Sequence, residues 1–186
     1  MRLEEKVAPV LVAGIGNLLL GDDGFGPQAI ARLQSEYELG SEVELLDLGT
    51  PALDFIDYLV GRKVVVLLDA LASGGEPGQV LTFTHAQLRE RVPGMRLSAH
   101  QPTLDETLLA ADTAGLALHE VTLIGVVGSS FDVGTELSEV VAGAMPQALQ
   151  LICDILRRAG VRVSKRETPL AMEAWWKTET PANPNV

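Results

Sequence analysis

Cysteine is nearly missing from this sequence. The 186 residues include one cysteine, Cys153, so no internal disulfide can form. The same count excludes a zinc or iron–sulfur site built from several cysteines. A single unpaired thiol is typical of proteins from reducing compartments, and we therefore expect a cytoplasmic protein.

Positive charge and long apolar runs are also scarce. Lys and Arg number 14 against 25 acidic residues, which gives a formal net charge of −11. Nucleic-acid binding and attachment to anionic membranes both need clustered positive charge, and both are disfavoured. The longest apolar stretches, such as 64–68, are far shorter than the roughly 20 residues of a membrane span. The opening residues 1–6 lack the apolar region of a signal peptide.

What the sequence does contain is an alternation of apolar strands with amphipathic helices. Hydrophobic residues make up 47% and charged residues 21%, as in globular domains. The patterns predict strands over 10–16, 42–48, 63–69, 80–83 and 121–127, and helices over 26–37, 53–60, 84–91, 102–118 and 137–158. This order favours an α/β fold of three layers, a mainly parallel twisted sheet with helices on both faces.

The expected organisation is one domain followed by a tail. Residues 1–163 are predicted to form a single α/β domain. Residues 164–186 lose the periodic pattern and end in a polar, proline-containing stretch, so we expect a mobile tail. Trp175 and Trp176 in that tail have no explanation at this level. Within the last predicted helix, Pro146 predicts a kink or a split into two helices.

Polar residues follow the predicted strands at the positions where α/β proteins bind ligands. Asn17, Asp22 and Asp23 follow the first strand, Asp69 ends the third, and His100 precedes the 102–118 helix. If Asp23, Asp69 and His100 meet at one edge of the sheet, they form a plausible divalent-metal site with open positions. Imidazole suits nickel, zinc or iron and carboxylates suit harder ions, so the mixture does not choose the metal.

Structural roles remain open for the same residues. Asp22 or Asp23 could cap the following helix, Asp69 could end its strand in a turn, and His100 could be an ordinary loop histidine. A Gly14-x-Gly16 turn resembles the start of a dinucleotide-binding fingerprint, but the required third glycine is replaced by leucine. Cys153 lies in an apolar helical stretch and is interpreted as a packing residue.

Residues 14–26 carry a longer pattern, Gly-Ile-Gly-Asn-Leu-Leu-Leu-Gly-Asp-Asp-Gly-Phe-Gly. This pattern resembles the opening signature of the hydrogenase maturation endopeptidases, in which the first strand runs into a G-x-G-N-x-L-x-x-D-[DE]-x-x-G loop. Residues 68–70 resemble the second acidic position of that family, and residues 98–101 resemble its histidine. Residues 123–127 and 134–138 resemble its late strand and the start of its last helix. Together the matches span about residues 10–160.

The resemblance implies a peptide hydrolase that removes the C-terminal extension of a nickel–iron hydrogenase large-subunit precursor after nickel insertion. It implies that Asp23 and Asp69 are catalytic and that, with His100, they contact nickel carried by the substrate, although other divalent ions could occupy the site. A carboxylate or a metal-bound water could be the attacking group. The resemblance also implies a substrate-facing loop that includes Asn17, Asp22, Gly24 and Gly26. The glycines of this loop would let the substrate chain come close and would offer N–H donors to an oxyanion.

Two other interpretations stay open at this level. One is a stand-alone divalent-metal hydrolase that uses the same three residues. The other is a non-catalytic α/β module that binds nickel or a nucleotide.

Overall fold

The apolar runs of the sequence form a five-stranded sheet in the computed structural model, which describes residues 7–51, 55–72, 75–89, 108, 111, 113–116 and 119–172. The strand order is β3-β1-β4-β6-β5, and only β5 runs antiparallel to its neighbour. Each strand lies within a residue or two of its predicted bounds. The strands are β1 (Val10–Ile15), β3 (Val43–Gly49), β4 (Val64–Leu71), β5 (Val80–Thr84) and β6 (Glu120–Val127).

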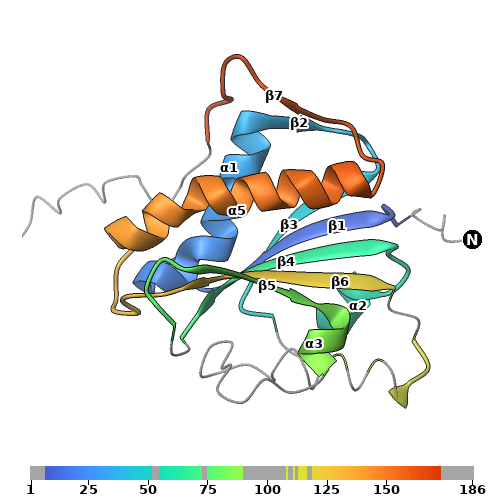
Figure 1. Cartoon of the computed structure of the whole chain (residues 1–186), viewed down its shortest axis with the longest axis horizontal. Coiled ribbons are helices and arrows are strands. Elements are labelled where there is room, and N and C mark those ends of the chain that lie inside the picture. The colour runs from blue at the N-terminus through green and yellow to red at the C-terminus, as the bar shows by residue number, and fades with distance from the viewer. Residues whose placement is uncertain are drawn as a thin grey trace, which may run out of the picture.

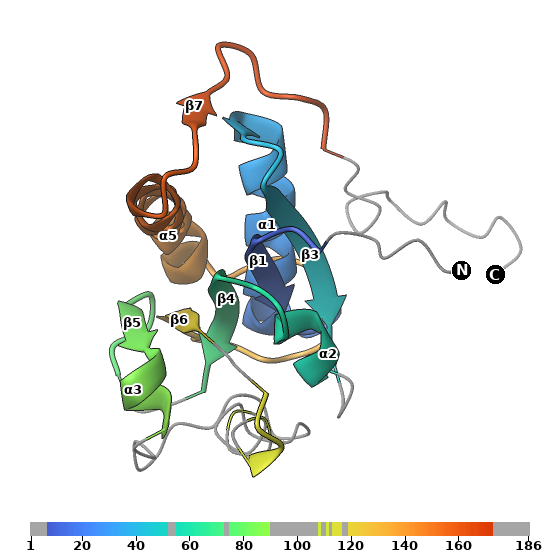
Figure 2. The same cartoon turned by 90° about the vertical axis from the view of Figure 1, so that its right-hand side faces the viewer.

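Helices cover both faces of this sheet, which confirms the predicted three-layer α/β fold. Figure 1 shows α1 (Phe25–Glu36) and α5 (Glu139–Arg158) above the sheet and α2 (Phe55–Leu59) and α3 (His85–Arg89) below it. Figure 2 shows the strands of the middle layer in the order β5, β6, β4, β1 and β3 from left to right. Successive side chains of a strand point to opposite faces. Val10 and Val12 therefore join the core under α1 and α5, whereas Leu11 and Ala13 join the core over α2.

The last helix, α5, corrects one prediction. Pro146 neither splits nor ends the helix, which runs unbroken for 20 residues. Proline has no N–H to donate to the carbonyl one turn earlier. Pro146 is exposed, however, and the opposite face of α5 buries an apolar stripe against the sheet. The buried residues are Val141, Ala144, Met145, Ala148, Leu149, Ile152, Cys153, Ile155 and Leu156. Packing of this stripe outweighs the lost hydrogen bond.

Helix α5 is also the one helix, within the part of the chain that the structure describes, that is long and apolar enough to cross a membrane. Half of its most apolar stretch is buried inside the fold, as in the core helix of a globular domain. Cys153 lies on this buried face, which confirms its predicted packing role.

Most of the predicted 102–118 helix lies outside the described residues. Two described residues of this range, Leu108 and Ala111, are fully buried. Leu108 packs into the core over α2.

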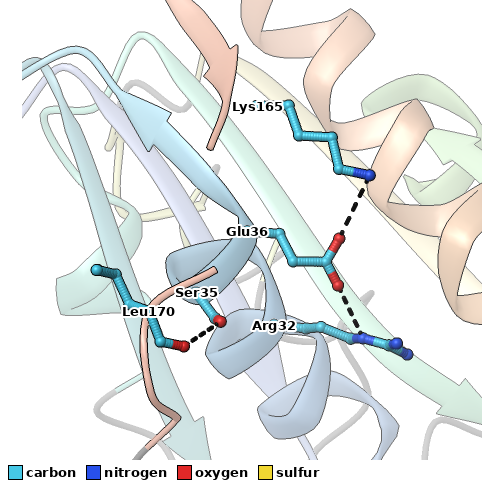
Figure 3. A network of polar contacts seen from close by, with 5 residues as sticks. All are labelled: Arg32, Ser35, Glu36, Lys165 and Leu170. Carbon is cyan, nitrogen blue, oxygen red and sulfur yellow. Dashed lines mark hydrogen bonds and ion pairs between the residues drawn. The ribbon is translucent and has the colours of Figure 1, made fainter. Parts of the chain in front are cut away.

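The C-terminal boundary was predicted too early. Residues 163–165 form β7 (Val163–Lys165), which pairs antiparallel with β2 (Tyr37–Leu39) in a second, two-stranded sheet. The chain then returns along α1, where Ser35 Oγ donates to the Leu170 carbonyl at 2.6 Å and Leu170 N–H donates to the Ser35 carbonyl at 3.0 Å. Figure 3 shows this contact beside the ion pairs that Glu36 makes with Arg32 and Lys165. The fold therefore extends at least to Leu170, and residues 173–186 lie outside the described residues.

Candidate active site

Two carboxylates meet at the carboxyl edge of the sheet. Asp23 lies in the one-turn helix η1 (Gly21–Gly24) directly after β1, and Asp69 lies inside β4. Strands β1 and β4 are parallel neighbours, with Gly14 opposite Leu68. The two acids are close enough that the charge of Asp23 raises the pKa of Asp69. The predicted convergence of Asp23 and Asp69 is therefore what the structure shows.

Each of these carboxylates has one bonded and one unbonded oxygen. Asp23 Oδ2 accepts a hydrogen bond from Asn17 N–H at 2.8 Å, and Asp69 Oδ1 accepts one from Ala70 N–H at 2.8 Å. Asp23 Oδ1 and Asp69 Oδ2 are buried and have no donor among the described residues. A buried oxygen without a partner is costly, so the arrangement calls for a cation or a proton at this point.

Burial also sets the proton affinity of both acids. Loss of hydration raises the pKa of Asp23, and the Asn17 N–H offsets part of this effect. Burial and then the charge of Asp23 raise the pKa of Asp69 well above its ordinary value. The two groups thus hold protons more tightly than free aspartates do. A divalent cation that binds the two unbonded oxygens would favour their ionised forms.

Asp22, the neighbour of Asp23, has the opposite environment. Its carboxylate is fully buried and accepts hydrogen bonds from Ser129 N–H at 2.7 Å, Ser130 N–H at 3.0 Å and Ser138 N–H at 2.7 Å. The Ser138 hydroxyl donates a fourth bond at 2.9 Å. Burial alone would raise its pKa, but these four bonds hold it below the ordinary value. The side chain of Asp22 therefore joins η1 to the loop between β6 and α5, and the substrate-facing role of the loop that contains it stays a prediction.

The capping and turn interpretations are also wrong. The N-cap of α1 is Gly24, with no side-chain cap, so neither Asp22 nor Asp23 caps that helix. Asp69 lies within a strand and pairs across from Gly125 in β6, not in a turn.

The glycines of the loop serve the chain's own packing. A Cβ atom on Gly16, whose φ is +130°, would overlap the carbonyl oxygen of Asp23, and one on Gly26 would overlap the carbonyls of Ile15 and Leu68. Gly24 is also buried, against Leu18. The close approach that these glycines permit within the fold is made by η1 and α1.

The N–H groups of two loop glycines are engaged as well. Gly16 N–H donates to the Gly49 carbonyl at 2.8 Å, and Gly21 N–H donates to the Gly134 carbonyl at 2.8 Å. These two groups are not free to bind an oxyanion. The same packing fills the space over the Gly14-x-Gly16 turn with the chain's own backbone, which argues against a dinucleotide site there.

Asn17 and Ser138 hold the two consecutive aspartates of η1 in place. Asn17 Oδ1 accepts a bond from Leu19 N–H at 3.0 Å, which folds the turn that aims its own N–H at Asp23. Ser138 caps α5 by accepting from Val141 N–H while it donates to Asp22. A serine before an amphipathic helix is a recognisable capping signal. The bond from Ser138 to Asp22, 116 residues away, could not be predicted from the sequence around Ser138.

The third predicted metal ligand, His100, lies outside the described residues. Within the described part of the chain, no group of three His, Cys, Asp or Glu side chains is placed to hold a metal ion. Asp23 and Asp69 form a two-carboxylate centre, and the three-ligand site with His100 stays a prediction.

The fold and this centre define the class of protein: a three-layer α/β protein with a buried acidic pair at the carboxyl edge of its sheet. A family model described as hydrogenase maturation protease matches residues 27–155, a range that includes Asp69. This chain belongs to the hydrogenase maturation protease family.

Individual relatives agree with the family match. The hydrogenase expression/formation protein HupD of Bradyrhizobium diazoefficiens is 32% identical over 163 residues, which cover 87% of this chain and 85% of the relative. The hydrogenase 2 maturation protease of Escherichia coli K12 is 30% identical over 162 residues, or 85% of this chain and 96% of the relative.

A solved structure shows the same fold. The hydrogenase maturating endopeptidase HybD from E. coli superposes with a TM-score of 0.77 at 28% identity, over 84% of this chain and 97% of that one. The protein is accordingly a peptide hydrolase, an endopeptidase of hydrogenase maturation.

Proposed function

We propose that this endopeptidase removes the C-terminal extension from the large-subunit precursor of a nickel–iron hydrogenase, after nickel has entered the precursor. The observation that carries the proposal is the pair of buried, unbonded oxygens, Asp23 Oδ1 and Asp69 Oδ2. Two acids this close favour a cation between them. The names of the relatives support a hydrogenase as the protein that is matured.

In this proposal nickel is part of the substrate and serves as the recognition element. Asp23 and Asp69 contact the nickel of the loaded precursor, and His100 is the predicted third contact. Burial raises the pKa of both carboxylates in the free enzyme, and contact with the metal favours their ionised forms. The contact also fixes which peptide bond lies against the acidic pair. A precursor without nickel lacks this anchor.

Hydrolysis of the peptide bond needs a group that takes a proton from the attacking water and returns it to the departing amine. With the metal at Asp23 Oδ1 and Asp69 Oδ2, the second oxygen of each carboxylate, which accepts one N–H bond, is the atom that can take up this proton. The carboxylate of Asp22 already accepts four hydrogen bonds, which supports assigning it to structure rather than to chemistry.

The test compares nickel-loaded and nickel-free large-subunit precursor, each mixed with the purified protein and followed by intact mass. We expect loss of a short C-terminal peptide only from the loaded precursor. Asp69→Asn should abolish the cleavage. Asp57→Asn, which removes the same charge from an exposed position of α2, should cleave at the wild-type rate.

A second outcome would favour the stand-alone divalent-metal hydrolase. That enzyme would cut nickel-free precursor and generic peptides when supplied with a divalent ion of its own. Failure to cut any hydrogenase precursor, loaded or not, would contradict the proposed function.

A further inference from the structure

Three apolar side chains are exposed on the loops that surround the acidic pair. Leu19 is 50% exposed, Phe131 is 37% exposed and Val133 is 91% exposed. Single exposed apolar residues are ordinary, but a contiguous group next to a functional site marks an interaction surface. We call Leu19, Phe131 and Val133 the apolar patch.

The backbone holds the two loops of the patch side by side. Gly134 N–H donates to the Leu19 carbonyl at 2.9 Å, and Leu20 and Gly134 form a parallel β-bridge. Val133 is the next residue along the chain from this bridge. The ring of Phe131 lies over Gly128, where a Cβ atom would overlap it. The patch thus spans two segments more than 100 residues apart in sequence.

Asp22 fixes the patch relative to the acidic pair. Its carboxylate binds the Ser129 and Ser130 N–H groups, and its own N–H donates to the Ser130 carbonyl at 2.9 Å. Because Asp23 is the next residue, the patch and the reacting group share one rigid support. A substrate segment bound on the patch is therefore held in a fixed position relative to Asp23.

The chain segments that carry the patch are acidic. Residues 17–31 and 128–156 contain no lysine or arginine. Asp132, Glu136 and Glu139 are exposed on the loop and on the first turn of α5. Arg32 shares a pocket of about 210 Å³ with Glu136 and forms an ion pair of 3.0 Å with Glu36, which also pairs with Lys165. A segment that binds here gains from apolar side chains in its centre and from positive charge beside them.

We propose that the apolar patch and its acidic border form a docking surface for a precursor segment that carries apolar side chains flanked by lysine or arginine. This inference rests on the proposed function, because it takes the polypeptide substrate of that reaction as the occupant. It adds the part of the enzyme that binds the chain, as distinct from the acidic pair that contacts nickel.

The apolar half of the proposal is tested with Leu19→Ser and Val133→Ser. The matched control is Leu170→Ser, since Leu170 is 52% exposed but lies on the C-terminal segment along α1. Nickel-loaded precursor is titrated against each protein to give Kd, and KM is taken from the mass-based cleavage assay. We expect each patch variant to raise Kd and KM roughly tenfold, the worth of part of a buried aliphatic side chain. The control should match the wild type.

The electrostatic half is tested at Glu136, whose side chain is exposed and forms no hydrogen bond or ion pair with the other described residues. Glu136→Lys should raise Kd between roughly 3- and 10-fold, and Glu136→Gln by less, with the difference shrinking in high salt. The matched control is Glu120→Lys, an exposed acid at the start of β6, at the opposite edge of the sheet.

The two proposals fail in different ways. If every patch variant cleaves the precursor at the wild-type rate with unchanged Kd and KM, the docking surface is overturned and the proposed function stands. A lower kcat with unchanged Kd also overturns it, because the residues would then act on the chemistry. Binding of the precursor without cleavage overturns the function, while the Kd ratios still decide the docking surface. Absence of binding by the wild-type protein overturns both.

Discussion

Asp22 and Asp23 are consecutive residues of one short helical turn, yet their carboxylates point into opposite chemical environments. Asp22 accepts four hydrogen bonds from a loop more than 100 residues away. Asp23 accepts one hydrogen bond, and its Oδ1 atom is buried and has no donor among the described residues. The first acid stabilises the structure because it is ionised. The second is held in a state that favours a proton or a cation. Asp22 supports the site, and Asp23 is the residue that we propose takes part in the reaction.

Removal of the Asp22 carboxylate should destabilise the protein strongly. Asp22→Ala leaves three backbone N–H groups and the Ser138 hydroxyl without their acceptor inside the fold. We expect a loss on the order of 3 kcal/mol in the free energy of unfolding, measured by urea denaturation. Asp57→Ala on exposed α2 should change it by about 0.5 kcal/mol or less. Equal stability of the two variants would show that the Asp22 bonds add nothing.

The stabilising effect of Asp22 should depend on pH in a defined direction. Its folded pKa lies below the ordinary value of 3.8, so its contribution is present above that value and is lost as the pH falls through the folded pKa. Thermal unfolding of the wild type and Asp22→Asn should therefore differ at neutral pH and converge in strong acid. A difference that stays constant down to the lowest pH would contradict the assignment.

Asp69 should show the reverse dependence in the nickel-free protein. Its folded pKa lies well above 3.8, so the carboxyl group holds its proton in the fold at a pH where the unfolded chain has lost it. Stability from this group is complete below about pH 4 and decreases as the pH rises through the folded pKa. Asp69→Asn removes this decrease, so its melting temperature should exceed that of the wild type at pH 7 and match it near pH 3. A lower melting temperature at pH 7 would contradict this expectation.

Gly16 should tolerate no side chain. Its φ of +130° is unfavourable for other residues, and an added Cβ would overlap the Asp23 carbonyl. Gly16→Ala should therefore displace η1, lower stability by about 3 kcal/mol and abolish precursor cleavage. Gly61→Ala is the control, because Gly61 also has a positive φ but has open space around it. We expect that variant to lose only about 1 kcal/mol and to keep its activity.

The end of the folded domain can be located by truncation. A chain that ends at residue 163 loses β7 and both hydrogen bonds between Ser35 and Leu170, and it uncovers the partly buried Tyr37 and Leu39. Its free energy of unfolding should be lower than that of a chain ending at residue 172, by on the order of 3 kcal/mol. If the two chains melt together, the segment after 163 is dispensable, as its sequence suggested.

The central sheet and the acidic pair were predictable because the signals for them are local. Runs such as 64–68 have no polar interruption and can only be buried strands, and parallel strands bring their carboxyl ends to one edge. That rule places Asp23 and Asp69 at the same edge, although it offers Asn17 and Asp22 equally with Asp23. Strands β2 and β7 are three residues each, too short for a periodic pattern, and each forms only against the other. The partners of Asp22 and the packing role of the glycines are tertiary contacts, so no local pattern encodes them. Pro146 shows the reverse, a strong local signal outweighed by the apolar face of its helix.

The four bonds of Asp22 also decide when the site can exist during synthesis of the chain. A nascent polypeptide that has emerged through β4 already contains Asp23 and Asp69, but Ser129, Ser130 and Ser138 are still to be made. Until the last third of the chain is released and α5 docks, the turn that carries Asp23 is held only by neighbouring residues such as Asn17. The four hydrogen bonds that join this turn to the later loop therefore form only after most of the chain has been made.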